Sequence, residues 1–351
     1  MENQNQTPHK RRVRYKGKYP KKFEEKYKEL QPEKYKDTIE HVIQKGNTPA
    51  GMHISIMVKE ILDFLNIQPG ETGFDATLGY GGHTKAMLQC LNGKGHIYAT
   101  DVDPEESAKT KKRLAEQGFG EELLTVKLQN FCTIDEIAKE VGGFDFILAD
   151  LGGSSMQIDN PKRGFSFKTD GPLDLRLNQE TGISAAQRLD TISREELAGM
   201  LCENSDEPYC EELAKAITDE IRRGNHIDTT TKLRQVIEKT LDFLPEKEKK
   251  ETIKKTCQRT FQALRIDVNH EFEVLYEFME KLPDALRPGG RVAILTFHSG
   301  EDKLVKKALK AGYKEGIYSD YAKDVIRPSA KECTQNPRAR STKMRWAIKA
   351  E

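Results

Sequence analysis

The stretch FDATLGYGGHTKAML, from Phe74 to Leu88, decides the expected fold. It begins with apolar residues that suit a buried strand, passes through a turn with three glycines and a histidine, and continues with helix-forming residues. Glycines in such a turn let ligand atoms approach the backbone closely, and the first turn of the helix presents unpaired N–H groups. The stretch therefore predicts a ligand site at the end of a strand, although a tight turn without a ligand has the same pattern.

Apolar runs bounded by turn residues predict the strands, and helical patterns such as Met57 to Leu65 and Glu105 to Gln117 lie between them. The last run, near the C-terminus, is expected to form an edge strand. Because strands alternate with helices, the sequence predicts a parallel, doubly wound α/β sheet. The predicted strands are TGFDATL (72–78), GHIYATD (95–101), FDFILAD (144–150), RVAILTF (291–297, after the turn Pro288-Gly289-Gly290) and MRWAIKA (344–350).

The pattern changes between Gly171 and about Lys255, where strand signals stop and helical segments such as SREELAGMLCE follow one another. A helical block between two strands of one sheet is most simply an insertion, and we expect it to recognise the substrate. The predicted organisation is a basic, flexible extension (1–47), a sheet domain in two parts (48–165 and 262–351) and an inserted helical domain (166–261).

Composition limits the classes of function. The 351 residues have a net charge of +1, but residues 1–36 contain twelve Lys or Arg against five Asp or Glu, interleaved with aromatic residues. This composition suits phosphate contacts and base stacking, or equally a solvated disordered tail.

The mean hydropathy of -0.71 and the lack of long apolar runs argue against a membrane protein. Six scattered cysteines without a CxxC pair suggest neither zinc nor disulfides, and no signal peptide is evident, so a cytoplasmic location is expected.

The ligand class follows from the turn GYGGHT (79–84) and the acids around it. The dinucleotide fingerprint G-x-G-x-x-G lacks its third glycine here, and Asp101 ends the next strand about twenty residues later, where an acid binds ribose hydroxyls. This arrangement serves NAD and S-adenosylmethionine alike. Carboxylates at Asp75, Asp101 and Asp150 favour a sulfonium cation over a pyrophosphate. For Asp150, a helix N-cap or turn position is the alternative explanation.

Taken together, the motifs resemble those of the MraW/RsmH family of 16S rRNA cytosine-N4 methyltransferases, from about Thr48 to Lys349. The resemblance implies a class I (Rossmann-like) S-adenosylmethionine methyltransferase sheet with an inserted all-helical domain, and N4-methylation of a cytidine in the decoding centre of the small ribosomal subunit. The implied partner is 16S rRNA or the small subunit, without a membrane, and the chain is compatible with a homodimer. The matching motifs are DATLGYGGHTKAML, DVDP, NF (130–131), DLGGSSMQID, RGFSF, GPLDLRLN, TFQALRIDVNHE, LRPGGRVAILTFHSGEDKLVK and NPRARSTKMR.

The resemblance also implies the cofactor contacts, whereas the catalytic and RNA-binding residues are our expectations from the chemistry of the reaction; no residue is expected to bind a metal. For catalysis we expect Asp150, Ser154 and His298, although a turn histidine without a role in catalysis is as plausible for His298. For the expected RNA contacts in RGFSF, ordinary loop packing is the alternative. For Arg259, and likewise for Arg265, the alternative to an RNA contact is a structural ion pair. The implied cofactor contacts are Gly81, Gly82, His83, Asp101 (ribose), Phe131 (adenine), Asp150 and Gln157, and the expected RNA-binding residues are Arg163, Phe165, Phe167 and Arg259.

Several positions depart from the family pattern, mostly on the substrate side. Gly153 and Met156 stand where Val and Pro are usual, and Gly300 replaces Leu. NSDE (204–207) and TCQR (256–259) replace Y-G-E-E and P-A-T-R, and the basic extension is longer than usual. A paralogue acting on another RNA cytidine is therefore an alternative, as is an RNA-binding assembly protein without turnover. A DNA amino-methyltransferase is disfavoured because its D/N/S-P-P-Y/F tetrapeptide is missing.

Overall fold

The computed structural model describes residues 55–351, and residues 53–351 form one compact unit. The predictions made for the basic extension lie outside the described residues. Within the described part, no helix is both long and apolar enough to cross a bilayer.

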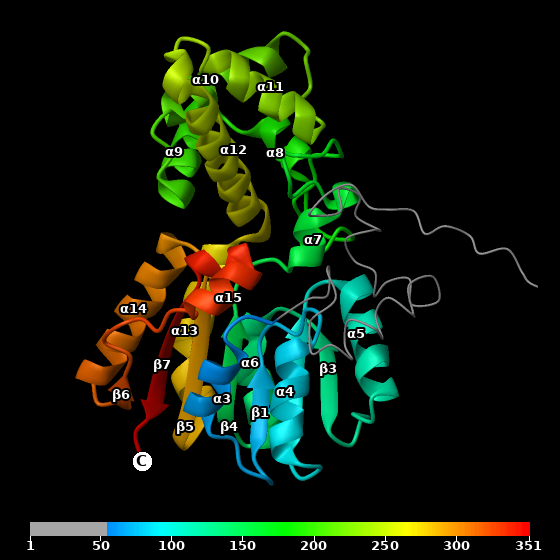
Figure 1. Ribbon diagram of the computed structural model, residues 1–351, viewed down its shortest axis with the longest axis vertical. Coiled ribbons are helices and arrows are strands. Elements are labelled where there is room, and N and C mark those ends of the chain that lie inside the picture. The colour runs from blue at the N-terminus through cyan, green and yellow to red at the C-terminus, as the bar shows by residue number, and fades with distance from the viewer. Residues whose placement is uncertain (1–54) are drawn as a thin grey trace, which may run out of the picture. The chain divides into compact units, whose positions relative to one another are not determined.

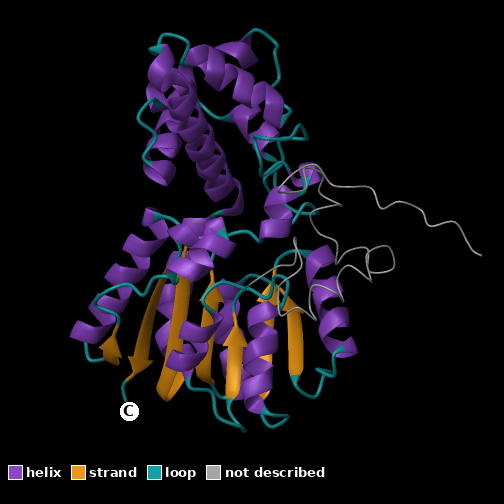
Figure 2. Ribbon diagram, viewed as in Figure 1, coloured by secondary structure: helices purple, strands orange, loops and turns teal. Residues whose placement is uncertain are grey.

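A seven-stranded sheet organises this unit (Figures 1 and 2). Its strand order is β3-β2-β1-β4-β5-β7-β6; the first five are parallel and β7 is antiparallel to both neighbours. The predicted α/β sheet of the class I type is confirmed. The strands are β1 (Thr72–Asp75), β2 (His96–Asp101), β3 (Leu124–Leu128), β4 (Phe144–Asp150), β5 (Leu286–Thr296), β6 (Tyr318–Tyr321) and β7 (Lys343–Lys349).

Two sequence-based expectations about the strands were wrong. The C-terminal run is not an edge strand, because β7 lies between β5 and β6. The true edges are β3 and β6, neither of which was predicted: β3 (LTVKL) alternates apolar and polar residues but has only five of them, and β6 (YSDY) has no apolar run. The Pro288-Gly289-Gly290 segment is not a turn before a strand either. It is an irregularity within β5, where the register with β4 shifts between Phe144 and Phe146.

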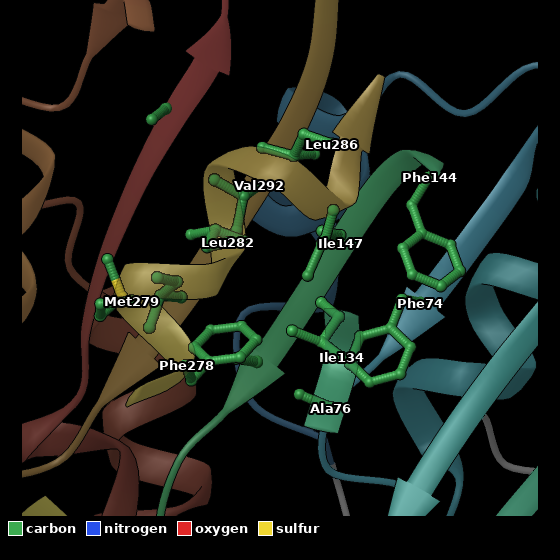
Figure 3. Packing of buried hydrophobic residues seen from close by; sticks show 14 of the residues in the cluster. Phe74, Ala76, Ile134, Phe144, Ile147, Phe278, Met279, Leu282, Leu286 and Val292 are labelled. Atoms are coloured by element: carbon green, nitrogen blue, oxygen red, sulfur yellow. The ribbon is translucent and has the colours of Figure 1, made fainter. Parts of the chain in front are cut away.

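Helices cover both faces of the sheet, as the alternation of side chains along β4 requires. Phe146 and Leu148 point to the face covered by α3, α4 and α5. Ile147 points to the opposite face, where α6, α13 and α14 pack, and Phe278 from α13 lies in the same core (Figure 3). The covering helices are α3 (Val58–Leu65), α4 (Gly82–Leu91), α5 (Pro104–Glu116), α6 (Ile134–Val141), α13 (Glu271–Ala285) and α14 (Ser299–Lys314); α7 (Ser155–Asp159) and α15 (Ala330–Gln335) are short.

Most of the segment between β4 and β5 builds a helical block (Figure 1). This block has its own apolar core. The long helix α12 runs out of this block, and His270 in the left-handed conformation (φ 51°) turns the chain into α13. Because α12 passes through residue 261 without a break, the domain boundary placed there stays a prediction. The helices of the block are α8 (Ala185–Thr191), α9 (Arg194–Ser205), α10 (Cys210–Arg222), α11 (Thr230–Thr240) and α12 (Glu246–Asn269).

The register brings the strand ends together at one edge of the sheet. Asp75 at the end of β1 is level with Ala99 of β2 and Leu148 of β4, so these two strands continue just beyond it to Asp101 and Asp150. The strand order reverses between β1 and β4, which is where open α/β sheets bind their ligands.

Candidate active site

A pocket of about 370 Å³ opens at this edge of the sheet. One wall comes from the loops after β1, β2, β3 and β4 and from residues 55–56. The other comes from the end of α12, the start of α13, and Phe297, Glu301, Asn336, Arg338 and Ser341. The structure brings together the predicted residues Gly81, Gly82, His83, Asp101, Phe131, Asp150, Ser154 and Gln157, all of which line the pocket. The lining does not include Arg163, Phe165, Phe167, Arg259 or His298.

The glycine loop is held in shape by α5. Gly79 and Gly81 both have left-handed backbones, with φ of 48° and 79°. Thr110 donates from its hydroxyl to the carbonyl of Gly79 at 2.7 Å, and a Cβ added at Gly81 would come within 2.7 Å of the Thr110 methyl. Arg113 lies over the ring of Tyr80, 3.6 Å from its centroid. The loop therefore needs glycine both for its backbone angles and for its packing against α5.

Asp101 is held by backbone donors at the end of β2. Its Oδ2 accepts from the N–H of Gly79 and its Oδ1 from that of Asp103, both at 2.9 Å. Burial raises the pKa of Asp101 to about 6, and the two backbone hydrogen bonds oppose that rise. At neutral pH the group is mostly ionised, and its remaining lone pairs can accept hydrogen bonds from ligand hydroxyls.

Asp150 and His83 form the charged centre of this wall. Asp150 Oδ2 lies 3.3 Å from His83 Nδ1, and the side chain of Asp150, which lines the pocket, is 26% exposed. Its Oδ1 has no hydrogen-bond partner among the described residues. A buried acceptor without a partner calls for an explanation, and a ligand bound in the pocket is one.

A buried acid, Asp103, ties the cofactor wall to the loop after β4. It caps α5 by accepting from the N–H groups of Glu105 and Glu106 with Oδ1. Its Oδ2 accepts from Gln157 Nε2 at 2.9 Å, and Gln157 in turn forms a capping box with Ser154 at the start of α7. Gln157 therefore reaches the pocket from a helix turn whose position depends on Asp103.

The second wall was largely missed by sequence reasoning. Arg265 donates to both oxygens of Glu271, at 2.8 and 2.9 Å. Glu301 is buried, and its Oε2 accepts from the N–H of Phe297 at 2.8 Å. Burial works against the charge of Glu301, but His298, the Phe297 amide and Arg265 together lower its pKa. The motifs TFQALRIDVNHE and TFHSGED contain these residues, but only the fold brings them to one cavity.

His298 lies behind this wall rather than in the pocket. Its Nε2 is 3.2 Å from Glu301, and its ring meets that of Phe272 edge-on at 5.7 Å. Phe272 also occupies the space beside Gly300, where an added Cβ would lie 2.6 Å from the ring. His298, Glu301 and Glu271 offer ligand atoms within 4.8 Å of one another. Because the Arg265 guanidinium already neutralises Glu271, this cluster is a poor metal site.

The expected RNA-binding residues lie in several places. Arg163 is buried in an ion pair with Asp103, and Phe165 is buried in the core of the helical block. Phe167 packs edge-on against Phe261, with ring centroids 5.9 Å apart. The side chain of Arg259 is 38% exposed and lies 4.0 Å from Glu207, so it is more accessible than Arg163.

Comparison with known proteins gives one consistent result. Residues 50–350 match the family described as MraW methylase. The chain is 85% identical over 343 residues to ribosomal RNA small subunit methyltransferase H 1 of Agathobacter rectalis, covering 98% of both chains. It is 62% identical to ribosomal RNA small subunit methyltransferase H 2 of Alkaliphilus metalliredigens, covering 97% of both. It is 37% identical to ribosomal RNA small subunit methyltransferase H of Acidobacterium capsulatum, covering 85% of this chain and 98% of that one.

The match covers both parts of the sheet and the helical segment between them, and the glycine loop, Asp101 and Asp150 lie within it. The chain belongs to the MraW methylase family, and its cofactor is S-adenosyl-L-methionine.

Proposed function

We propose that this chain methylates the exocyclic N4 amine of a cytidine in 16S rRNA, in the decoding centre of the small ribosomal subunit. The observation that carries the proposal is the carboxylate of Asp150, which stands in the pocket with one oxygen lacking a partner among the described residues. The names of the curated relatives support a small-subunit rRNA substrate. A ribosomal substrate would place the chain in the cytoplasm.

The residues present fit S-adenosyl-L-methionine. This cofactor supplies an electrophilic methyl group on a sulfonium cation. Carboxylates dominate the first wall, whereas the arginines in the lining, Arg265 and Arg338, belong to the opposite wall. A cationic sulfonium suits that distribution better than a pyrophosphate. Gly81 and Gly82 would hold the amino-acid end with backbone groups, Asp101 the ribose hydroxyls and Phe131 the adenine.

Asp150 has the main chemical role in this proposal. The lone pair of a cytosine amine is delocalised into the ring, so the nitrogen must become pyramidal before it attacks. A carboxylate that accepts an amine hydrogen favours this change and stabilises the positive charge that develops. Because the amine proton becomes acidic once the nitrogen is alkylated, Asp150 need not act as a strong base beforehand. Much of the rate would come from positioning.

Ser154 and Glu301 would hold the acceptor base in place. The Ser154 oxygen accepts from the N–H of Gln157, which leaves the hydroxyl hydrogen to donate toward the base. Glu301 offers acceptor oxygens from the second wall, and His298 positions it from behind. The target base must leave its stack to reach the pocket, at a cost of a few kcal/mol. Arg259 is the predicted residue with the best access to a phosphate.

The test is a transfer assay with labelled S-adenosyl-L-methionine on 30S subunits and on protein-free 16S rRNA, followed by nucleoside analysis and mapping. N4-methylcytidine in the decoding centre is the expected product. N4-methylcytidine at another RNA position would instead indicate a paralogue with a changed target. Absence of both product and cofactor binding would favour the assembly protein without turnover.

The matched variants are Asp150→Asn and Asp324→Asn. Asp324 is an exposed carboxylate outside the pocket, so its loss should leave turnover unchanged. Asp150→Asn should reduce turnover by at least a hundredfold, and a parallel cofactor titration separates lost chemistry from lost binding. Full activity of Asp150→Asn would remove this residue from the mechanism.

A further inference from the structure

His83 is held on both sides of its ring. It is the second residue of α4 and is buried beside the pocket. Its Nε2 lies 2.8 Å from the backbone carbonyl oxygen of Ile56, and its Nδ1 lies 3.3 Å from Asp150 Oδ2. Both neighbours are acceptors, so the two ring nitrogens are matched by two oxygens that can only receive a hydrogen.

This geometry selects one protonation state. Since a carbonyl oxygen cannot donate, Nε2 must carry a hydrogen. A neutral ring would then present the Nδ1 lone pair to a carboxylate, which is repulsive, whereas the imidazolium donates to both partners. Burial works to lower the pKa of His83, but Asp150, the Ile56 carbonyl and the nearby charge of Asp75 together raise it.

We infer that His83 is a positioning residue for Asp150: pinned by Ile56, it donates from Nδ1 to Asp150 Oδ2 and holds that carboxylate in the orientation it uses in the pocket. The inference rests on the proposed function only for what Asp150 does to the acceptor. A second contact of Asp150 does not fix its side chain. The Thr77 hydroxyl accepts from the Asp150 backbone N–H at 2.8 Å, which leaves the carboxylate free to rotate.

The Ile56 carbonyl is itself fixed, which makes it a firm support for His83. Met57, the next residue, has a left-handed backbone with φ of 58° and is buried. Its N–H donates to Glu332 Oε1 on α15 at 2.7 Å. Ser55 packs so closely on the glycine loop that a Cβ at Gly82 would lie 1.9 Å from its hydroxyl oxygen. The short segment 55–57 thus connects α15 to α4, and His83 extends that connection to β4.

The first experiment measures the ion pair directly and uses the wild-type protein without RNA. An NMR titration of the His83 imidazole should give a pKa above the ordinary value, with both nitrogens protonated at neutral pH. In Asp150→Asn that pKa should fall, although Asp75 still faces the ring. An unchanged pKa in Asp150→Asn would overturn the inference, whatever the acceptor of the enzyme proves to be.

The second experiment is a double-mutant cycle read out as the affinity for S-adenosyl-L-methionine in the absence of RNA. His83→Gln and Asp150→Asn should each weaken binding about tenfold, and the double variant should be no weaker than either single one. Additive losses would mean that the two residues act separately and would refute the inference. Because neither readout needs methyl transfer, a failure of the proposed RNA target leaves this test intact.

His96→Gln is the matched control. His96 also bridges two partners, the Glu122 carbonyl and the Thr125 hydroxyl, but it lies outside the pocket lining. This variant should keep wild-type cofactor affinity.

Turnover distinguishes a positioning role of His83 from a purely structural one. His83→Gln should lower kcat at least tenfold while changing the KM for RNA less than threefold. A general loss of structure would instead lower the melting temperature and affect both parameters.

Discussion

The guanidinium of Arg163 lies 2.8 Å from Asp103 Oδ2, and both side chains are buried beneath the loop that carries Gln157. Arg163 also donates to the carbonyl oxygens of Leu177 at 2.6 Å and of Arg176 at 3.3 Å. One side chain thus joins the acid that caps α5 to the chain entering the helical block. This arrangement assigns Arg163 a structural role, in place of the phosphate contact expected from the sequence.

Arg163→Ala should therefore destabilise the protein. Removing one partner of a buried ion pair leaves the other charge uncompensated, which costs about 3–5 kcal/mol. Urea unfolding measures the loss, and the exposed neighbour Lys162→Ala should stay within about 0.5 kcal/mol of the wild type. If Arg163→Ala kept full stability and lost only RNA affinity, the side chain would be an RNA contact after all.

Cofactor affinity should fall at acid pH because of Asp101. Its pKa of about 6 means that lowering the pH from 7 to 5 converts most of the carboxylate to the neutral acid. If only the ionised form binds the ribose, the Kd for S-adenosyl-L-methionine should rise about tenfold over this range. Calorimetric titrations at several pH values give the curve. Asp101→Asn should bind weakly with no such dependence, and an equally steep curve in that variant would assign the titration to another group, such as Asp75.

Replacing each of two neighbouring glycines by alanine should change the stability of the fold in opposite directions. Gly152 has φ of 91°, so Gly152→Ala should cost about 1–2 kcal/mol in backbone strain. A Cβ at Gly153 meets its nearest neighbours at 3.6–4.0 Å, which is ordinary contact, and Gly153 does not have a positive φ. Gly153→Ala should therefore stabilise the fold by about 0.4–1 kcal/mol, because alanine lowers the conformational entropy of the unfolded chain. Melting temperatures test the pair, and a large loss in Gly153→Ala would show that this position needs the flexibility of glycine.

Phe131 should contribute directly to cofactor binding. Its ring lines the pocket and is supported edge-on by Phe278, with centroids 5.2 Å apart. Stacking of an aromatic ring on a base is worth about 1–3 kcal/mol, so Phe131→Ala should weaken cofactor binding about 5- to 150-fold. Leu128→Ala, an exposed apolar change on β3 nearby, should have no effect on affinity. A change of less than twofold in Phe131→Ala would exclude the stacking role.

Much of the fold and of the first wall of the pocket could be predicted, because local patterns carry that information. Apolar runs of strand length and glycines in the turns predicted β1, β2, β4 and the core of β5. Carboxyl ends of parallel strands share one edge, so the sequence alone was enough to place Asp101 and Asp150 near the glycine loop. The edge strands were missed for different reasons: β3 (LTVKL) does alternate apolar and polar residues but is only five residues long, whereas β6 (YSDY) has no apolar run at all.

By itself, then, the sequence determined an α/β sheet with a glycine loop and two acids at its carboxyl edge, since these depend on residues close together in the chain. The tertiary structure decided what depends on distant segments. It brought Arg265 and Glu301 to the second wall, buried Arg163 against Asp103 and placed His83 between Ile56 and Asp150. Each of these side chains has a charge whose role depends on its partner, and the choice of partner follows from packing between elements, which no local pattern records.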